Sequence, residues 1–174
     1  MRTSRWRWAR WIGIGAAVLL VGFVGLSAIG ANTGDHTMAS VTYAQRPPHS
    51  GDHSPVWQKC GFYREPVGDE HAVHSLEHGS VWIAYRPNLA ADQIELLRPL
   101  AGVEEQVIVS PYPGLTSALV VTSWGHQQSF DTVDIGQLEA AIQTLRTSGQ
   151  APEPNGGCDG PNLFFSGATG DPEP

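Results

Sequence analysis

The sequence of 174 residues lacks the short motifs that identify most large enzyme classes. It contains no G-x-S-x-G elbow, no phosphate-binding P-loop, no glycine-rich dinucleotide fingerprint and no EF-hand calcium loop. Its two methionines, Met1 and Met38, are too few for a methionine-rich site for cuprous ions. Any chemistry that the protein performs must therefore depend on other side chains.

Basic residues are scarce beyond the amino terminus. Four arginines lie within the first ten residues, which contain no acid, whereas residues 31–174 hold 6 basic and 17 acidic side chains. The formal charge of this larger part is −11, compared with −7 for the whole chain. Because a body of this charge repels phosphate backbones, we expect no nucleic-acid partner.

Charge is absent altogether from residues 11–29, a run of 19 residues. About 20 apolar residues suffice for a helix to span a bilayer, and flanking arginines stay cytoplasmic. We therefore predict a cytoplasmic basic tail (1–10), a transmembrane anchor (11–30) and an extracytoplasmic remainder, so that the protein spans the cell membrane once. A cleaved signal peptide is the alternative, since Ala28 and Gly30 form a small-x-small pair, and it would also export the domain.

Cysteine is rare as well. Cys60 and Cys158 are the only two cysteines, and they form no C-x-x-C motif. In an oxidising compartment outside the cytoplasm, such a pair is most simply one disulfide. It would tie the Gly/Pro-rich tail (150–174) to the start of the domain. Two unrelated free thiols are the alternative.

The pattern of apolar residues predicts a small exported domain over residues 47–149, after a tether at 31–46. We expect strands at 81–85, 107–109, 118–124 and 126–130. A helix should span 89–100, with Asn88 as its cap. A second helix should run from 135 to Gly149, with Asp134 as its cap and Gln137 as the capping-box partner. The first two strands should be parallel and the third antiparallel. The expected fold is a two-layer α/β domain with a mixed sheet and two main helices, and α+β is the alternative.

Histidines, in contrast, are concentrated in residues 70–79. At 100° per residue, His71, His74 and His78 share about 60° of a helical face, and the apolar side chains fall on the other side. The segment is therefore predicted to form a short helix that Gly79 ends. His74 and His78 would lie one turn apart, a spacing that lets two imidazoles bind one metal ion.

Two further histidines, His49 and His53, lie in the upstream turn and either could supply a third ligand. We predict a site for one divalent transition metal, zinc or copper(II), made by His53, His74 and His78 with Glu77 close by. Glu77 could bind the ion, orient a ligand histidine or activate a metal-bound water.

Other interpretations of this cluster stay open. The histidines could be purely structural in a cell-envelope interaction domain, or they could sense pH. A metal-dependent hydrolase with Glu77 as its catalytic base is a further alternative. The pattern His74-x-x-Glu77-His78 is formally that of inverted zinc peptidases, but the helix is too short for their scaffold. Whether the protein is an enzyme is left open, with binding favoured over catalysis.

Several segments together resemble a family of bacterial membrane-anchored proteins, the domain of unknown function DUF3105. The resemblance covers about residues 43–158, and it rests on PPHSGDH (47–53), CGFY (60–63), HSLEHGSVW (74–82), SPYPGL (110–115), WG (124–125) and APEP (151–154). It implies an amino-terminal anchor, one exported domain, and His53, His74, Glu77 and His78 as the residues to test. It names no activity, and it implies no role for His49 or His71.

Overall fold

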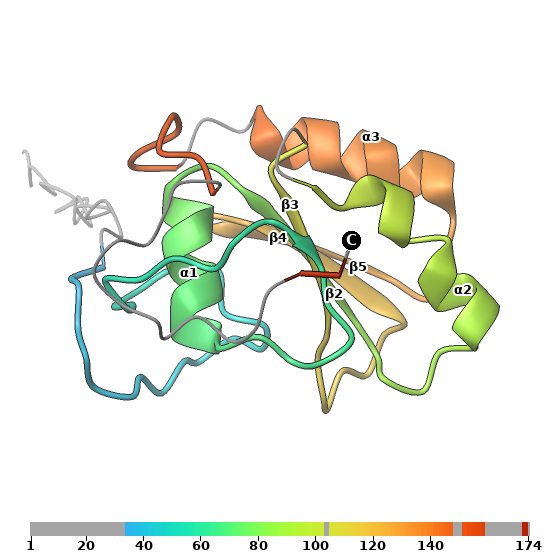
Figure 1. Ribbon diagram of the computed structural model, residues 1–174, viewed down its shortest axis with the longest axis horizontal. Coiled ribbons are helices and arrows are strands. Elements are labelled where there is room, and N and C mark those ends of the chain that lie inside the picture. Colours follow the sequence, from blue (N-terminus) through green and yellow to red (C-terminus); the bar gives the residue numbers. More distant parts are fainter. Residues whose placement is uncertain (1–33, 103–104, 148–150, 159–171, 174) are drawn as a thin grey trace, which may run out of the picture.

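A computed structural model describes residues 34–102, 105–147, 151–158 and 172–173 (Figure 1). The elements follow one another as β1 (Gly61–Phe62), α1 (Asp69–Glu77), β2 (Val81–Tyr85), α2 (Ala91–Glu95), the 3₁₀ helix η1 (Arg98–Leu100), β3 (Val107–Pro111), β4 (Leu119–Ser123), β5 (His126–Phe130) and α3 (Ile135–Arg146). The predicted membrane span, residues 11–30, lies outside the described residues. None of the helices within the described ranges is both long and apolar enough to cross a membrane.

The strands form one mixed sheet in the order β1-β3-β2-β4-β5. The central strand β2 pairs in parallel with β3, as predicted, and antiparallel with β4. Although β4 follows β3 in the chain, it lies on the far side of β2, and β5 extends the sheet as an antiparallel neighbour. The mixed sheet with its helices makes the protein α+β, the alternative to the α/β class.

Both faces of the sheet are covered, so the expectation of two layers is wrong. Along β2, Val81, Ile83 and Tyr85 face the core under α2, η1 and α3, whereas Trp82 and Ala84 face the core under α1 (Figure 1). Every residue of β2 is buried. A strand buried on both faces has an uninterrupted apolar sequence, as here, rather than an alternating one.

The helix predicted at 89–100 is instead two short pieces, α2 and η1. Its cap is Ala90 rather than Asn88, and Pro99, which has no backbone N–H, lies inside the tighter 3₁₀ turn. The break buries Leu97 completely and leaves Leu96 half exposed.

The longer helix α3 begins as predicted. The Asp134 carboxylate accepts from the Gln137 backbone N–H at 3.0 Å, which is the expected cap. The Gln137 side chain donates to the same carboxylate at 3.1 Å instead of turning back to the cap backbone. Gly149, the predicted end of this helix, lies outside the described residues, and Thr147 is the observed cap.

The predicted disulfide is confirmed, and the alternative of two free thiols is wrong. Cys60 and Cys158 are bonded, both are buried, and their Cα atoms are 5.4 Å apart. The backbone N–H of Cys60 also donates to the Cys158 carbonyl at 3.2 Å. The bond therefore fixes residues 151–158 beside the start of β1, next to α1.

Candidate metal centre

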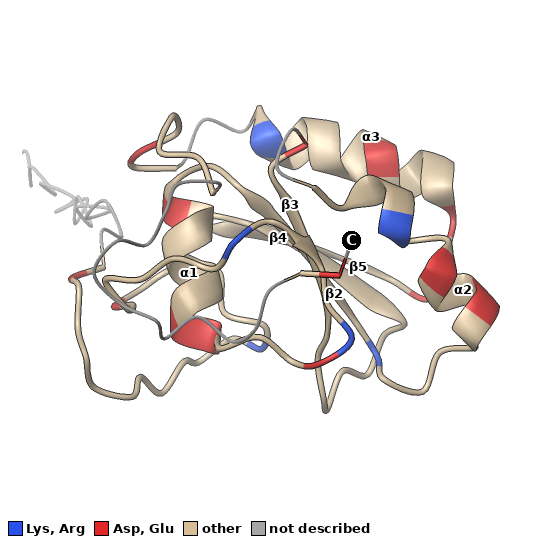
Figure 2. Ribbon diagram, viewed as in Figure 1, with Lys and Arg blue, Asp and Glu red and all other residues tan. Residues whose placement is uncertain are grey.

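Helix α1 forms and ends as the sequence predicts. Asp69 and Glu70 lie in its first turn, where negative charge stabilises a helix, and α1 carries acids at both ends but no lysine or arginine (Figure 2). The helix ends because Gly79 adopts φ +91°, and its N–H donates to the Leu76 carbonyl at 3.0 Å. A Cβ at Gly79 would meet the backbone of Pro154 at 3.0 Å, so the tail packs closely there.

The two faces of α1 are buried against different parts of the protein. Ala72, Val73 and Leu76 pack into the core under the sheet. His74, Glu77 and His78 are also buried, being 4%, 7% and 8% exposed. Their side chains contact the loop that precedes β1 and the tail segment 151–158. The polar stripe of the helix therefore lies in the interior of the protein.

Backbone carbonyls fix the orientation of three imidazoles. Each ring donates its Nδ1–H to a carbonyl oxygen: His53 to Gly51 at 2.9 Å, His74 to Ser54 at 2.6 Å and His78 to Gly157 at 2.9 Å. A carbonyl oxygen only accepts, so the proton of each neutral ring resides on Nδ1. The lone pair is then on Nε2, and a carbonyl that holds Nδ1 in this way orients a histidine for metal binding through Nε2.

The three Nε2 atoms face acceptors instead of donors. His53 Nε2 lies 3.0 Å from Glu77 Oε2, and His74 Nε2 lies 3.0 Å from His78 Nε2. With the protons on Nδ1, lone pairs oppose each other at both contacts, and an additional proton or a metal ion would remove this repulsion. Two ligand atoms bound to one tetrahedral zinc ion at about 2.1 Å are themselves about 3.4 Å apart. The observed spacings are close to that value.

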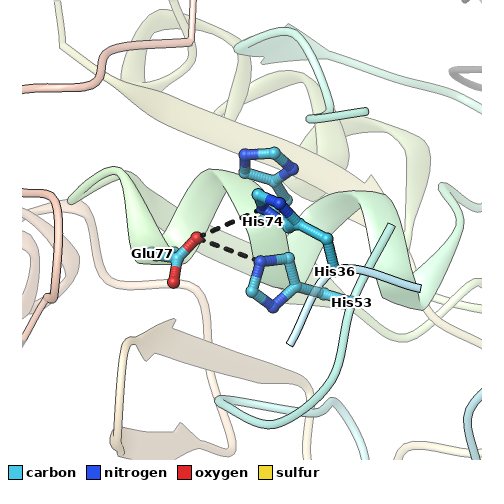
Figure 3. A group of neighbouring side chains, drawn as sticks. All are labelled: His36, His53, His74 and Glu77. Atoms are coloured by element: carbon cyan, nitrogen blue, oxygen red, sulfur yellow. Dashed lines mark hydrogen bonds and ion pairs between the residues drawn. The ribbon is translucent and has the colours of Figure 1, made fainter. Parts of the chain in front are cut away.

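A fourth imidazole, His36, joins the cluster from the segment predicted to be a tether. His36 and His53 form a parallel β-bridge, in which the Thr37 N–H donates to the His53 carbonyl at 2.7 Å. His36 Nε2 lies 3.8 Å from Glu77 Oε2, and its side chain is 53% exposed. Ligand atoms of His36, His53, His74 and Glu77 all lie within 4.8 Å of one another (Figure 3).

A second group of donors adjoins the first and shares Glu77 with it. Ligand atoms of Glu77, His78 and Glu153 lie within 4.8 Å of one another. His78 Nε2 is 3.5 Å from a Glu153 oxygen, and the Glu153 N–H donates to the Glu77 carbonyl at 3.0 Å. Glu153 comes from the tail segment and was not predicted from the sequence.

The chain matches the family described as Protein of unknown function (DUF3105) over residues 36–160. It belongs to this family. The match begins at His36 and includes Glu153, so both donor groups lie inside the DUF3105 region. No curated protein and no solved structure matches the chain significantly.

Two predicted candidates of the DUF3105 domain lie apart from these groups. His71 donates Nδ1–H to the Val56 carbonyl at 2.7 Å, and His49 Nδ1 lies 3.1 Å from the Ser50 hydroxyl. Among the described residues, neither belongs to a set of neighbouring ligand atoms. Thus the structure brings together the four predicted residues, His53, His74, Glu77 and His78. It adds His36 and Glu153 to them, and it gives His71 a structural contact.

The surroundings of His74 favour its neutral form. Burial, together with the nearby rings of His78, His53 and His36, lowers the pKa of His74 to about 3, against the opposing effect of its hydrogen bond to Ser54. Indole rings enclose the site: Trp57 lies 5.8 Å from His74 and 5.6 Å from His78, and Trp124 lies edge-on, 5.9 Å from His53. A metal ligand must be unprotonated, so His74 needs to release no proton on binding.

Proposed function

We propose that the protein is a membrane-anchored, extracytoplasmic metal-binding protein whose DUF3105 domain holds a divalent transition-metal ion, zinc or copper(II). The observation that carries the proposal is the set of imidazoles whose Nδ1 atoms are held by carbonyls and whose Nε2 atoms converge beside the Glu77 carboxylate. Imidazole and carboxylate donors suit both ions, and affinity alone favours copper.

The ion would bind between His53, His74 and Glu77, with His36 as the exposed fourth ligand. A set of four protein donors fits the tetrahedral coordination of zinc. Because the Glu77 carboxylate lies among the donor atoms, we assign it to the ion rather than to the role of a general base. Binding, rather than hydrolysis, is therefore the proposed function.

Extracytoplasmic placement is supported by two features of the chain. Residues 11–29 carry no charge and follow four arginines. The Cys60–Cys158 disulfide is of the kind that persists in oxidising compartments. Protease added to intact spheroplasts should therefore degrade the domain. Protection of the domain would contradict the proposed topology.

Calorimetric titration of the purified full-length chain, in detergent, with zinc and with copper(II) tests metal binding directly. We expect binding of at least one ion more tightly than about 10 μM, or about −7 kcal/mol. The double variant His74→Ala/His78→Ala should bind at least a hundredfold more weakly, and circular dichroism should establish that it is folded. His71→Ala is the matched control, because His71 lies on the same helix outside both donor groups.

Equal binding by the double variant, or no binding of either ion by the natural chain, would contradict the proposal. The histidines would then serve only to hold loops through their carbonyl contacts, as His71 does at Val56. An interaction domain in the cell envelope, with structural histidines, would be the function that remains.

A further inference from the structure

The cluster contains more donors than one ion uses. His36, His53, His74 and Glu77 already make up the four ligands of a tetrahedral zinc ion. His78 and Glu153 are outside that set, although both lie within 4.8 Å of Glu77. Both are polar groups beside the same buried carboxylate, and the first ion does not bind either of them.

The second group has the spacing of a ligand set in its own right. The 3.5 Å between His78 Nε2 and the Glu153 oxygen is close to the separation of about 3.4 Å expected for two ligands of one ion. His78 Nδ1 is held by the Gly157 carbonyl, so its Nε2 lone pair is aimed as those of the first group are. The Glu153 side chain is 64% exposed at the surface, whereas the His78 side chain is 10% exposed, which gives an ion a path from solvent.

Glu77 is the only residue that the two groups have in common among the described parts of the chain. A carboxylate has two oxygens and can bind one ion with each. Ions in two-metal sites lie about 3.5–4 Å apart, a separation that a shared carboxylate can bridge. The buried position of Glu77 at the end of α1, between the His53 loop and the tail segment, is the position that such a bridge requires.

The tail segment is fixed strongly enough to supply ligands. The Cys60–Cys158 disulfide and the hydrogen bond from the Glu153 N–H to the Glu77 carbonyl hold it against α1. Gly156 packs against the imidazole of His78 so closely that a Cβ there would lie 2.5 Å from the ring. These contacts place His78 and Glu153 before any ion binds.

We propose that the centre is dinuclear: Glu77 bridges a first divalent ion, bound by His36, His53 and His74, and a second divalent ion, bound by His78 and Glu153. This inference rests on the proposed function, because a second ion requires the first group to bind metal. The second ion has fewer protein ligands and a more exposed one, so it binds more weakly and exchanges first.

Metal stoichiometry of the full-length chain decides between one ion and two. Titration with zinc and with copper(II) should give two equivalents per chain. At two equivalents of copper(II), magnetic coupling between neighbouring ions should remove much of the electron paramagnetic resonance intensity seen at one equivalent. Glu153→Gln should bind one equivalent with full intensity. Glu139→Gln, which alters an exposed acid of α3 on the opposite side of the sheet, should still bind two.

Each outcome has one meaning. One equivalent in the natural chain overturns the second ion and leaves the proposed function standing. No binding overturns both proposals. Two equivalents in Glu153→Gln, or two uncoupled copper ions, overturn the bridged arrangement. If Glu139→Gln loses one equivalent, the weaker ion binds at the exposed acids of α3. That result also overturns the second site.

Discussion

Because His74 is buried, we predict how the free energy of unfolding of the metal-free protein depends on pH. His74 is 4% exposed, and its pKa is about 3 in the native state compared with 6.5 in an unfolded chain. Between these two values the unfolded chain binds a proton that the native protein does not. The free energy of unfolding should therefore fall as the pH drops from about 6.5 toward 3, and this group should have little effect above about pH 7.5.

The size of the effect follows from the same two pKa values. Each pH unit over which only the unfolded chain is protonated lowers the free energy of unfolding by up to about 1.4 kcal/mol. With these two pKa values, protonation of His74 in the unfolded chain lowers the free energy of unfolding by about 2 kcal/mol between pH 7 and pH 5. Screening by water that reaches the exposed edge of the cluster reduces this, so we expect about 1–2 kcal/mol.

Urea unfolding of chelator-treated protein at pH 7 and pH 5 measures this loss. His74→Gln is the matched variant, because an amide can still donate to the Ser54 carbonyl but does not titrate. The loss between the two pH values should be about 1–2 kcal/mol larger in the natural protein than in His74→Gln. An equal loss in both proteins would show that His74 takes up its proton in the native state, and the argument from burial would be refuted.

Other predictions concern the tail and the ions. The Cys60→Ser/Cys158→Ser double variant should lose about 4–5 kcal/mol of unfolding free energy in urea, since the bond closes a loop of 98 residues. Gly156→Ala should displace His78 and weaken the second equivalent of zinc at least tenfold in calorimetry, whereas Gly136→Ala, where a Cβ has ordinary contacts, should not. Zinc at one hundred times its dissociation constant should raise the unfolding free energy by about 2.7 kcal/mol per site in thermal denaturation, and chelation should reverse this.

Most of the elements predicted from the sequence have a repeating apolar pattern or a recognisable cap, and the polar strand β5 is the exception. The strands β2, β3 and β4, α1 with its end at Gly79, and the Asp134 cap of α3 all have local signals of side-chain type and spacing. The two-residue strand β1 has no such signal, because its pairing depends on Ile108 and Val109 in a distant strand. The prediction of two layers is wrong although β2 is apolar throughout, a pattern typical of strands covered on both faces.

The candidate site also contains residues that the sequence could predict and residues that it could not. His74, Glu77 and His78 could be grouped from sequence because helical spacing relates them, and His53 because it follows a turn-forming segment. His36 and Glu153 could not, because they reach the site through a β-bridge and through the tail that the disulfide holds. The only available signal for them was their residue type, in segments without periodicity.

The segment that carries His36 has little apolar surface to bury. From residue 34 to residue 46 no side chain is fully buried. Tyr43 packs against the apolar core under α1. Polar contacts accompany it: the bridge to His53, the Val41 N–H donating to Glu70 at 2.9 Å and the Tyr43 hydroxyl donating to the Asp52 carbonyl at 2.6 Å. Hydrogen bonds of this kind offset only part of the entropy lost on ordering a chain. In the proposed function, the bond from His36 to the first ion adds to these contacts, so metal binding further stabilises the position of this segment.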